Sequence, residues 1–371
     1  MFSSSSIILF LACLVVFSTA SPVRQRRCPA VTASTPSPSV SSPPLNVVKG
    51  SVLPVPSSAS NSRSSTPTSS SSTAASTPTS GSGGSSGPTI PGLLGSLFPV
   101  PGFSKSWTTS PSSDNALALS DAAFRPTNVL RSVPHTYVNA PDGKKAMKAH
   151  YPQGSYTFGN DPQGGFSFYA PGPSSLDLST AKEATFGYSV YFPKGFAFNL
   201  GGKLPGLYGG NSEAEAVGCS GGRRSSACFS ARLMWRSGGQ GEFYTYLPPY
   251  TESRFAANRK VCNIAPASDC NPTYGASVGR GAFTFATGAW TTISERVRLN
   301  DVGQANGEIQ LFVNGKSVIN VGGLILRDSA AGRIRGMQMQ TFFGGSHPEF
   351  ASPKNQDVFF SDFSAAITRT L

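Results

Sequence analysis

The stretch "FSARLMWRSGGQGEFYTYLP" (residues 229–248) contains two runs in which apolar and polar side chains alternate, joined by a glycine-rich turn. Successive side chains of an extended chain point to opposite faces of a sheet. The apolar face of the first run consists of Phe229, Ala231, Leu233 and Trp235, and the opposite face of Ser230, Arg232, Met234 and Arg236. In the second run Glu242, Tyr244 and Tyr246 share one face. The pattern predicts two strands with an apolar back and a polar front.

The rest of the chain extends this pattern. Helical periodicity is nearly absent beyond residue 97, and short β-branched and aromatic runs recur between turn residues. Strands are expected at 145–151, 165–169, 184–192, 229–235, 242–247, 290–299, 308–313, 317–319, 336–342 and 358–367. Asn314-Gly315 lies between two of them and predicts a type I′ hairpin. We therefore predict an all-β fold, a two-sheet jelly-roll sandwich whose concave face forms a substrate groove.

The N-terminal quarter differs in composition from the remainder. Residues 1–20 resemble a secretory signal peptide, because an apolar stretch precedes Ser18-Thr19-Ala20. Residues 21–96 are dominated by serine, threonine, proline and glycine, which predicts a disordered linker. Residues 97–371 are then expected to form one domain of a secreted, extracellular protein. No later segment approaches the roughly 20 apolar residues that a membrane-spanning helix needs.

Charge is also unevenly distributed. All 18 acidic residues lie at or beyond Asp114, and five of the 30 basic residues precede the domain, which leaves a net charge of +7 on it. A basic secreted protein is expected to meet a polyanion, and outside the cell an acidic polysaccharide is a more natural partner than nucleic acid. Solubility alone is an alternative reason for the charge. We predict a monomer with neither a nucleic-acid nor a membrane partner.

The cysteine spacing predicts two short-range disulfides. Cys219 and Cys228 flank one polar loop, and Cys262 and Cys270 flank another, while Cys28 stays unpaired in the linker. The spacings do not match a zinc site, and the three histidines are scattered. We expect no metal and no cofactor.

A basic residue follows the strand expected at 184–192. The segment "KGFAFNLGGKLPGLYGG" (194–210) is rich in glycine and proline, which predicts a constrained loop that presents Lys203. A lysine in such a loop either serves as a charged group over a groove or is an ordinary solvated residue.

Four segments together resemble polysaccharide lyase family 14, whose members include alginate and glucuronan lyases with a β-jelly-roll fold. They are "GGKLPGLYGG" (201–210), "FSARLMWR" (229–236), "GEFYTYLP" (241–248) and "TFFGGSHPEFASPKNQDVFFSDF" (341–363). The resemblance covers residues 137–367. It implies catalytic roles for Lys203, for the pair Ser230 and Arg232, and for the pair Tyr244 and Tyr246.

A lyase of this kind cleaves a 1,4-linked polyuronate by β-elimination. A base removes the proton at C5 and the 4-linked sugar departs, so negative charge develops beside an existing carboxylate. The Arg232 guanidinium can donate two parallel hydrogen bonds to this carboxylate. Tyr244 or Tyr246 would be base, acid or both if cationic neighbours lower the tyrosine pKa, and Lys203 is a rival base. Ser230 would bind the substrate or orient Arg232. Packing is the alternative role of the tyrosines.

Further residues are candidates for substrate binding. Gln338 and Gln340 face one side of an expected strand, Arg236 shares the face of Arg232, and His347 lies in a loop near the groove. Arg296 and Arg298 either extend the cationic groove or lie on the outer face, and Glu242 is expected to hold an arginine.

Two other functions compete with the lyase. A jelly roll that binds an anionic glycan without cleaving it would need the same cationic groove. A hydrolase would need two opposed carboxylates, and Glu242 is the only acid in residues 229–248, the segment that carries four of the five catalytic candidates.

Overall fold

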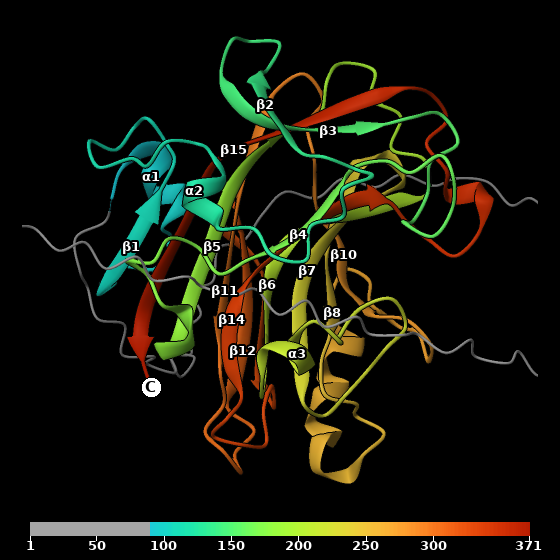
Figure 1. Cartoon of the computed structure of the whole chain (residues 1–371). Coiled ribbons are helices and arrows are strands. Elements are labelled where there is room, and N and C mark those ends of the chain that lie inside the picture. Colours follow the sequence, from blue (N-terminus) through green and yellow to red (C-terminus); the bar gives the residue numbers. More distant parts are fainter. Residues whose placement is uncertain (1–89) are drawn as a thin grey trace, which may run out of the picture. The chain divides into compact units, whose positions relative to one another are not determined.

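The computed structural model describes residues 90–371, and the expected signal peptide, most of the linker and Cys28 lie outside them. Two antiparallel sheets make up the fold, and the predicted two-sheet jelly-roll sandwich is confirmed (Figure 1). No helix of the described part is long and apolar enough to cross a membrane.

Sheet A has the strand order β13-β12-β11-β5-β15-β3-β2, and β1 also pairs with β15. Its strands are β1 (Lys105–Thr108), β2 (Thr136–Asn139), β3 (Lys145–Tyr151), β5 (Ala181–Tyr191), β11 (Trp290–Arg298), β12 (Gly307–Val313), β13 (Lys316–Leu324) and β15 (Gln356–Thr370). Asn314 and Gly315 have positive φ angles of 49° and 80°, and they join β12 to β13 in the predicted hairpin.

Sheet B has the order β4-β14-β6-β7-β8-β10-β9. Its strands are β4 (Phe166–Ala170), β6 (Gly201–Gly210), β7 (Cys228–Arg236), β8 (Gln240–Tyr246), β9 (Asp269–Cys270), β10 (Ala276–Thr284) and β14 (Arg333–Phe343). The alternation expected in β7 is confirmed, because Phe229, Ala231, Leu233 and Trp235 all belong to the core between the sheets.

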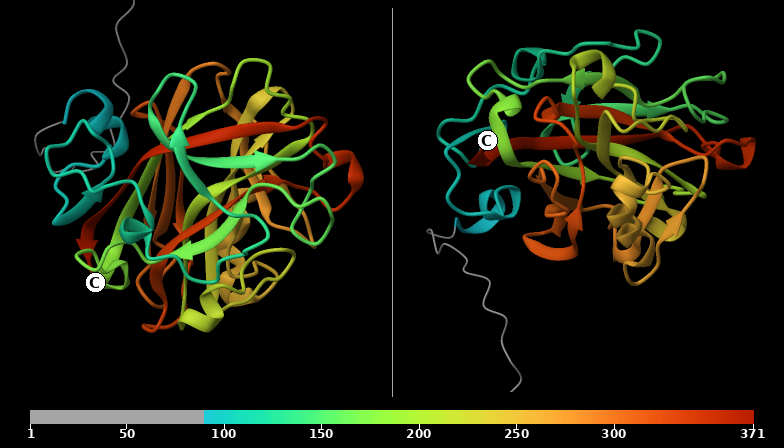
Figure 2. Two further views of the ribbon diagram at one scale, coloured as in Figure 1. Left: turned by 45° about the horizontal axis from the view of Figure 1, so that its top comes forward. Right: turned by 90° about the horizontal axis from the view of Figure 1, so that it is seen from below.

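The helices are short. They are α1 (Gly92–Leu97), α2 (Asp121–Phe124) and α3 (Glu213–Ala216), with 3₁₀ turns η1 (Leu178–Thr180), η2 (Ser237–Gly239), η3 (Ser253–Asn263) and η4 (Pro348–Phe350). The fold already includes α1, although the sequence placed the start of the domain at residue 97. Leu97 and Phe98 pack against Ala366 of β15, which fixes α1 to sheet A. Figure 2 shows α1 and β1 beside the end of β15.

Strand β6 corrects the prediction of a loop around Lys203. Gly202 has no side chain because the ring of Trp235 on β7 occupies that space, where a Cβ atom would lie 2.0 Å from Cζ2. Pro205, which cannot donate to a ladder, lies where the pairing of β6 with β7 shifts register. The Leu207 amide beyond it donates to the carboxyl oxygen Oε1 of the buried Glu295 across the core, at 2.5 Å. The glycine and proline residues of this segment therefore belong to a central strand of sheet B.

Candidate active site

The five predicted catalytic side chains come together on the front of sheet B, the face turned away from the core. Lys203 lies on β6, Ser230 and Arg232 on β7, and Tyr244 and Tyr246 on β8. These strands are direct neighbours, with Arg232 paired to Tyr244 and Ser230 to Tyr246. Lys203 has the largest exposed fraction of the five, 8 %. The cluster is therefore almost wholly shielded from water.

Lys203 is held by contacts that do not compensate its charge. Its Nζ lies 2.7 Å from the Sδ atom of Met234 and 3.4 Å from the ring centre of Tyr244. Burial lowers the Lys203 pKa well below its ordinary value, and the neighbouring Arg236 and Arg232 lower it further, against the opposing effect of Glu242. The environment thus favours the neutral amine, which is a base.

Arg232 is a buried cation without an acidic partner among the described residues. Its Nη1 donates to Oε1 of Gln340 at 2.9 Å, and its Nε has no hydrogen-bond partner in that part of the chain. A buried guanidinium normally has an ion-pair partner. Arg232 can therefore offer donors to an anionic group that enters the cluster.

Both phenol oxygens accept a backbone hydrogen bond. The Gly275 amide donates to Tyr244 at 3.2 Å, and the Gly222 amide donates to Tyr246 at 3.0 Å. Burial, with a smaller effect of Tyr246, raises the Tyr244 pKa, and Arg232 lowers it by less. The condition for a tyrosine base, a pKa lowered by cationic neighbours, is not met at Tyr244, because desolvation outweighs those neighbours. Its neutral phenol is a proton donor.

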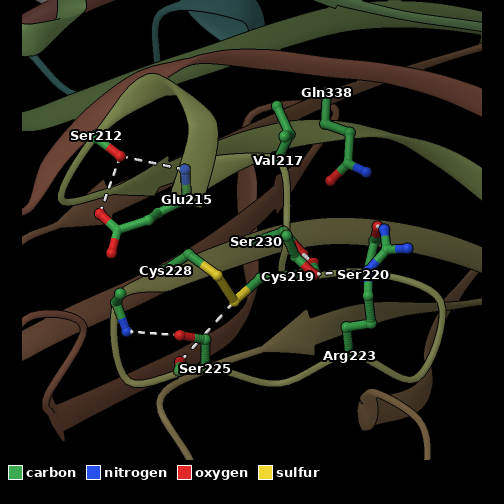
Figure 3. Close-up of a disulfide and its surroundings, with 12 residues drawn as sticks. Ser212, Glu215, Val217, Cys219, Ser220, Arg223, Ser225, Cys228, Ser230 and Gln338 are labelled. Atoms are coloured by element: carbon green, nitrogen blue, oxygen red, sulfur yellow. Dashed lines mark hydrogen bonds between the residues drawn. A yellow bond between two sulfur atoms is a disulfide. The ribbon is translucent and has the colours of Figure 1, made fainter.

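Ser230 contacts the loop that precedes β7. Its hydroxyl donates to the carbonyl of Cys219 at 2.9 Å (Figure 3), and within the described residues it makes no hydrogen bond to Arg232. Both predicted disulfides are present, Cys219–Cys228 with a Cα–Cα distance of 5.8 Å and Cys262–Cys270 with 5.3 Å.

Comparison with known proteins identifies the family of this chain. The sequence profile described as Polysaccharide lyase 14 matches residues 139–363. The chain belongs to polysaccharide lyase family 14. It is accordingly a carbon–oxygen lyase that acts on polysaccharides.

Two solved structures are similar to this lyase. The marine PL-14 alginate lyase from Aplysia kurodai is 33 % identical, with a TM-score of 0.59 over 71 % of this chain and 99 % of that one. An alginate lyase from a Chlorella virus is 27 % identical, with a TM-score of 0.52 over 66 % of this chain and 93 % of that one. The search of curated proteins gave no match.

The two glutamines of this lyase lie beside the catalytic candidates. Gln340 on β14 links Arg232 to Ser167, to whose hydroxyl its Nε2 donates at 3.0 Å. Gln338 donates to Gln340 at 2.8 Å and to the hydroxyl of Tyr169 at 3.2 Å. They form a polar row that orients the guanidinium.

Arg236 and Glu242 form a second network at the other side of Lys203. Glu242 is fully buried and accepts from Arg236 at 2.7 Å, from Arg280 at 2.9 Å and from Ser277 at 2.5 Å. The prediction that Glu242 holds an arginine is confirmed, and it holds two. Arg236 is thus paired with a carboxylate, unlike Arg232.

Within residues 90–371, three other basic candidates make no hydrogen bond or ion pair to the cluster. Arg296 and Arg298 belong to β11 of sheet A, where they pair with Glu308, so they do not extend the cationic face of sheet B. His347 is exposed before η4, and its imidazole makes no hydrogen bond within residues 90–371.

Sequence reasoning missed two contributors to the site. Met234 shares the front of β7 with Arg232. Its contact with the Lys203 side chain has no sequence signal, because a methionine in a strand normally indicates a packing role. Arg280 reaches Glu242 from β10, a strand absent from the predicted set. Among residues 90–371, no three His, Cys, Asp or Glu side chains gather as a metal site would require.

Proposed function

We propose that this protein is a secreted lyase that cleaves 1,4-linked polyuronates, alginate or glucuronan, by β-elimination. The observation that carries the proposal is the uncompensated, buried Arg232 guanidinium beside Lys203 and two phenols. A uronate carboxylate is the group that such a guanidinium binds bidentately. The two similar structures are alginate lyases, which supports a polyuronate substrate.

The reaction divides between these side chains. Arg232 binds the carboxylate at C5 and stabilises the negative charge that grows as the C5–H bond breaks. The neutral amine of Lys203 takes that proton, since burial and the neighbouring arginines lower the Lys203 pKa and so favour the unprotonated form. The C4–O bond then breaks, and a double bond forms between C4 and C5.

A phenol supplies the second proton. Tyr244 or Tyr246 protonates the departing oxygen, and the proton that Lys203 took from C5 then returns to the phenolate through water. Each proton taken is returned, so the site is unchanged after turnover.

Secretion rests on separate observations. The apolar segment at 7–17 is typical of a signal peptide. The two disulfides Cys219–Cys228 and Cys262–Cys270 are bonds that persist in oxidising compartments. Recovery of the protein from culture medium, with the N-terminus beginning after residue 20, is the expected outcome.

The test is a panel of polyuronates incubated with purified protein. We expect new chain ends that absorb ultraviolet light, and loss of this signal in Lys203→Ala and Tyr246→Phe. Lys194→Ala, in an exposed loop, and Tyr191→Phe, on sheet A, are matched controls that retain it. Normal turnover in Lys203→Ala would contradict the assigned base. Retention of the polymers without new chain ends would instead identify a binding protein.

A further inference from the structure

Both phenols at the site depend on loops that lie outside the predicted catalytic set. The amide that donates to Tyr246 belongs to Gly222. Gly222 lies in the sequence between Cys219 and Cys228, whose disulfide closes the loop (Figure 3). The amide that donates to Tyr244 belongs to Gly275, at the end of the 271–275 turn between β9 and β10. Two loops, distant in sequence, thus serve the two phenols in the same way.

The 271–275 turn is built to a fixed shape. The side chain of Asn271 accepts hydrogen bonds from the amides of Thr273, at 2.8 Å, and Tyr274, at 2.9 Å, and the Cys262–Cys270 disulfide precedes it. Gly275 lies directly against both phenol rings, because a Cβ atom there would be 2.7 Å from Tyr246 Cε2 and 2.9 Å from Tyr244 Cε1.

One side chain joins the two loops. The guanidinium of Arg224, which belongs to the 219–228 loop, donates through Nη2 to the carbonyls of Asn271 and Tyr274. The loops also approach each other at Gly222, where a Cβ atom would lie 3.5 Å from the carbonyl of Thr273. Within residues 90–371, the neighbouring Arg223 instead donates to the hydroxyl of Ser220, in the same loop, and to the carbonyl of Gly218, which immediately precedes that loop.

We propose that Arg224 is a positioning residue, which clasps the 219–228 loop to the 271–275 turn and so keeps two amide donors on the oxygens of Tyr246 and Tyr244. The inference rests on the proposed function, in which one of these phenols gives up its proton. A hydrogen bond donated to a phenolate is charge-assisted and therefore stronger than one that the same amide donates to a neutral phenol. The clasp thus favours the transition state over the bound substrate.

The expected effect is on kcat. Removal of one preorganised donor to a developing oxyanion costs about 10²–10³ in kcat in other enzymes. Arg224→Ala loosens both donors without deleting either, so we expect kcat on a polyuronate to fall by roughly tenfold or more, with KM changed less. Arg224→Lys keeps a cation within reach of the two carbonyls and should recover part of the rate.

The experiment compares Arg224→Ala and Arg224→Lys with Arg223→Ala, which removes the same charge from the same loop. Each variant is assayed on the polymer and on a uronate carrying a 4-O-nitrophenyl group, whose departing oxygen needs no proton. We expect the Arg224→Ala defect to be large on the polymer and nearly absent on the activated substrate, with Arg223→Ala normal on both. Thermal unfolding establishes that each variant is folded, and Arg224→Lys carries the test if Arg224→Ala is not.

Three outcomes would overturn the proposal. They are equal losses in Arg223→Ala and Arg224→Ala, a defect confined to KM, and an Arg224→Ala defect of the same size on the activated substrate. If the wild-type protein forms no unsaturated product from either substrate, the proposed function itself fails, which is a different result from an active wild type with an unimpaired Arg224→Ala variant.

Discussion

Neutralising Glu242 tests the electrostatics of the site, because this fully buried carboxylate opposes the burial that lowers the Lys203 pKa. In Glu242→Gln the Lys203 pKa should fall further, so that the amine becomes neutral at a lower pH. If Lys203 is the base, the acidic limb of the kcat/KM profile moves to lower pH. The shift follows in sign from the loss of a negative neighbour.

The same substitution has a cost in stability that the structure allows us to work out. Removing one partner of a buried ion pair costs about 3–5 kcal/mol. The side chains released, Arg236 and Arg280, are 16 % and 35 % exposed, so water solvates them in part and the lower end applies. A loss of about 3 kcal/mol corresponds to a fall in Tm of roughly 5 °C for a domain of this size.

The assay is the initial rate of unsaturated product at low substrate concentration, measured across pH, beside urea unfolding. Glu183→Gln is the matched control, because Glu183 is a buried carboxylate on sheet A that pairs with Arg296 at 2.6 Å. It should lose stability while the acidic limb stays in place. An acidic limb that stays fixed or moves upward in Glu242→Gln would refute the assignment of Lys203 as the base, and a shift of the alkaline limb alone would indicate that Lys203 acts as a cation.

Three further outcomes are expected for the fold. Burial raises the pKa of Glu295 well above its ordinary value, so the folded state keeps a proton that the unfolded chain releases. The free energy of unfolding should therefore fall as pH rises above about 4.3, by up to about 1.4 kcal/mol per pH unit. Urea unfolding across pH should show this slope in the wild type and not in Glu295→Gln. Gly202→Ala should lower the free energy of unfolding by about 1–3 kcal/mol, since its Cβ atom overlaps the Trp235 ring, and an unchanged urea midpoint would contradict that packing. Reduction of the two disulfides, each of which closes a short loop, should cost about 2–3 kcal/mol apiece, measured as the difference in unfolding with and without a reductant.

The sequence predicts the parts of this fold that depend on local patterns. The alternation in 229–236 places Arg232 on the front of sheet B and Trp235 in the core, and Asn314-Gly315 forms the expected hairpin. Side-chain period and turn chemistry act within a few residues, so they are readable without the fold. The two disulfides are predictable for the same reason.

Features that depend on distant segments were not predictable. Glycine and proline around Lys203 indicate a loop, and only Trp235 on the next strand and Glu295 across the core explain why they form β6. The Tyr244 pKa depends on how far the strands and loops bury the ring. The Ser230 hydroxyl is committed to a carbonyl 11 residues earlier, a partner that spacing does not reveal.

The position of β15 in sheet A sets the order in which the polypeptide can reach its native state. This strand, the last in the sequence, lies between β5 and β3 and also pairs with β1, where Trp107 faces Ala365. Neither half of the sheet is joined to the other until residues 356–370 have been synthesised. Such long-range pairing favours slow completion of the fold. Truncations or fusions that disturb this strand should therefore prevent folding of the whole domain, and not only remove one strand from the sheet.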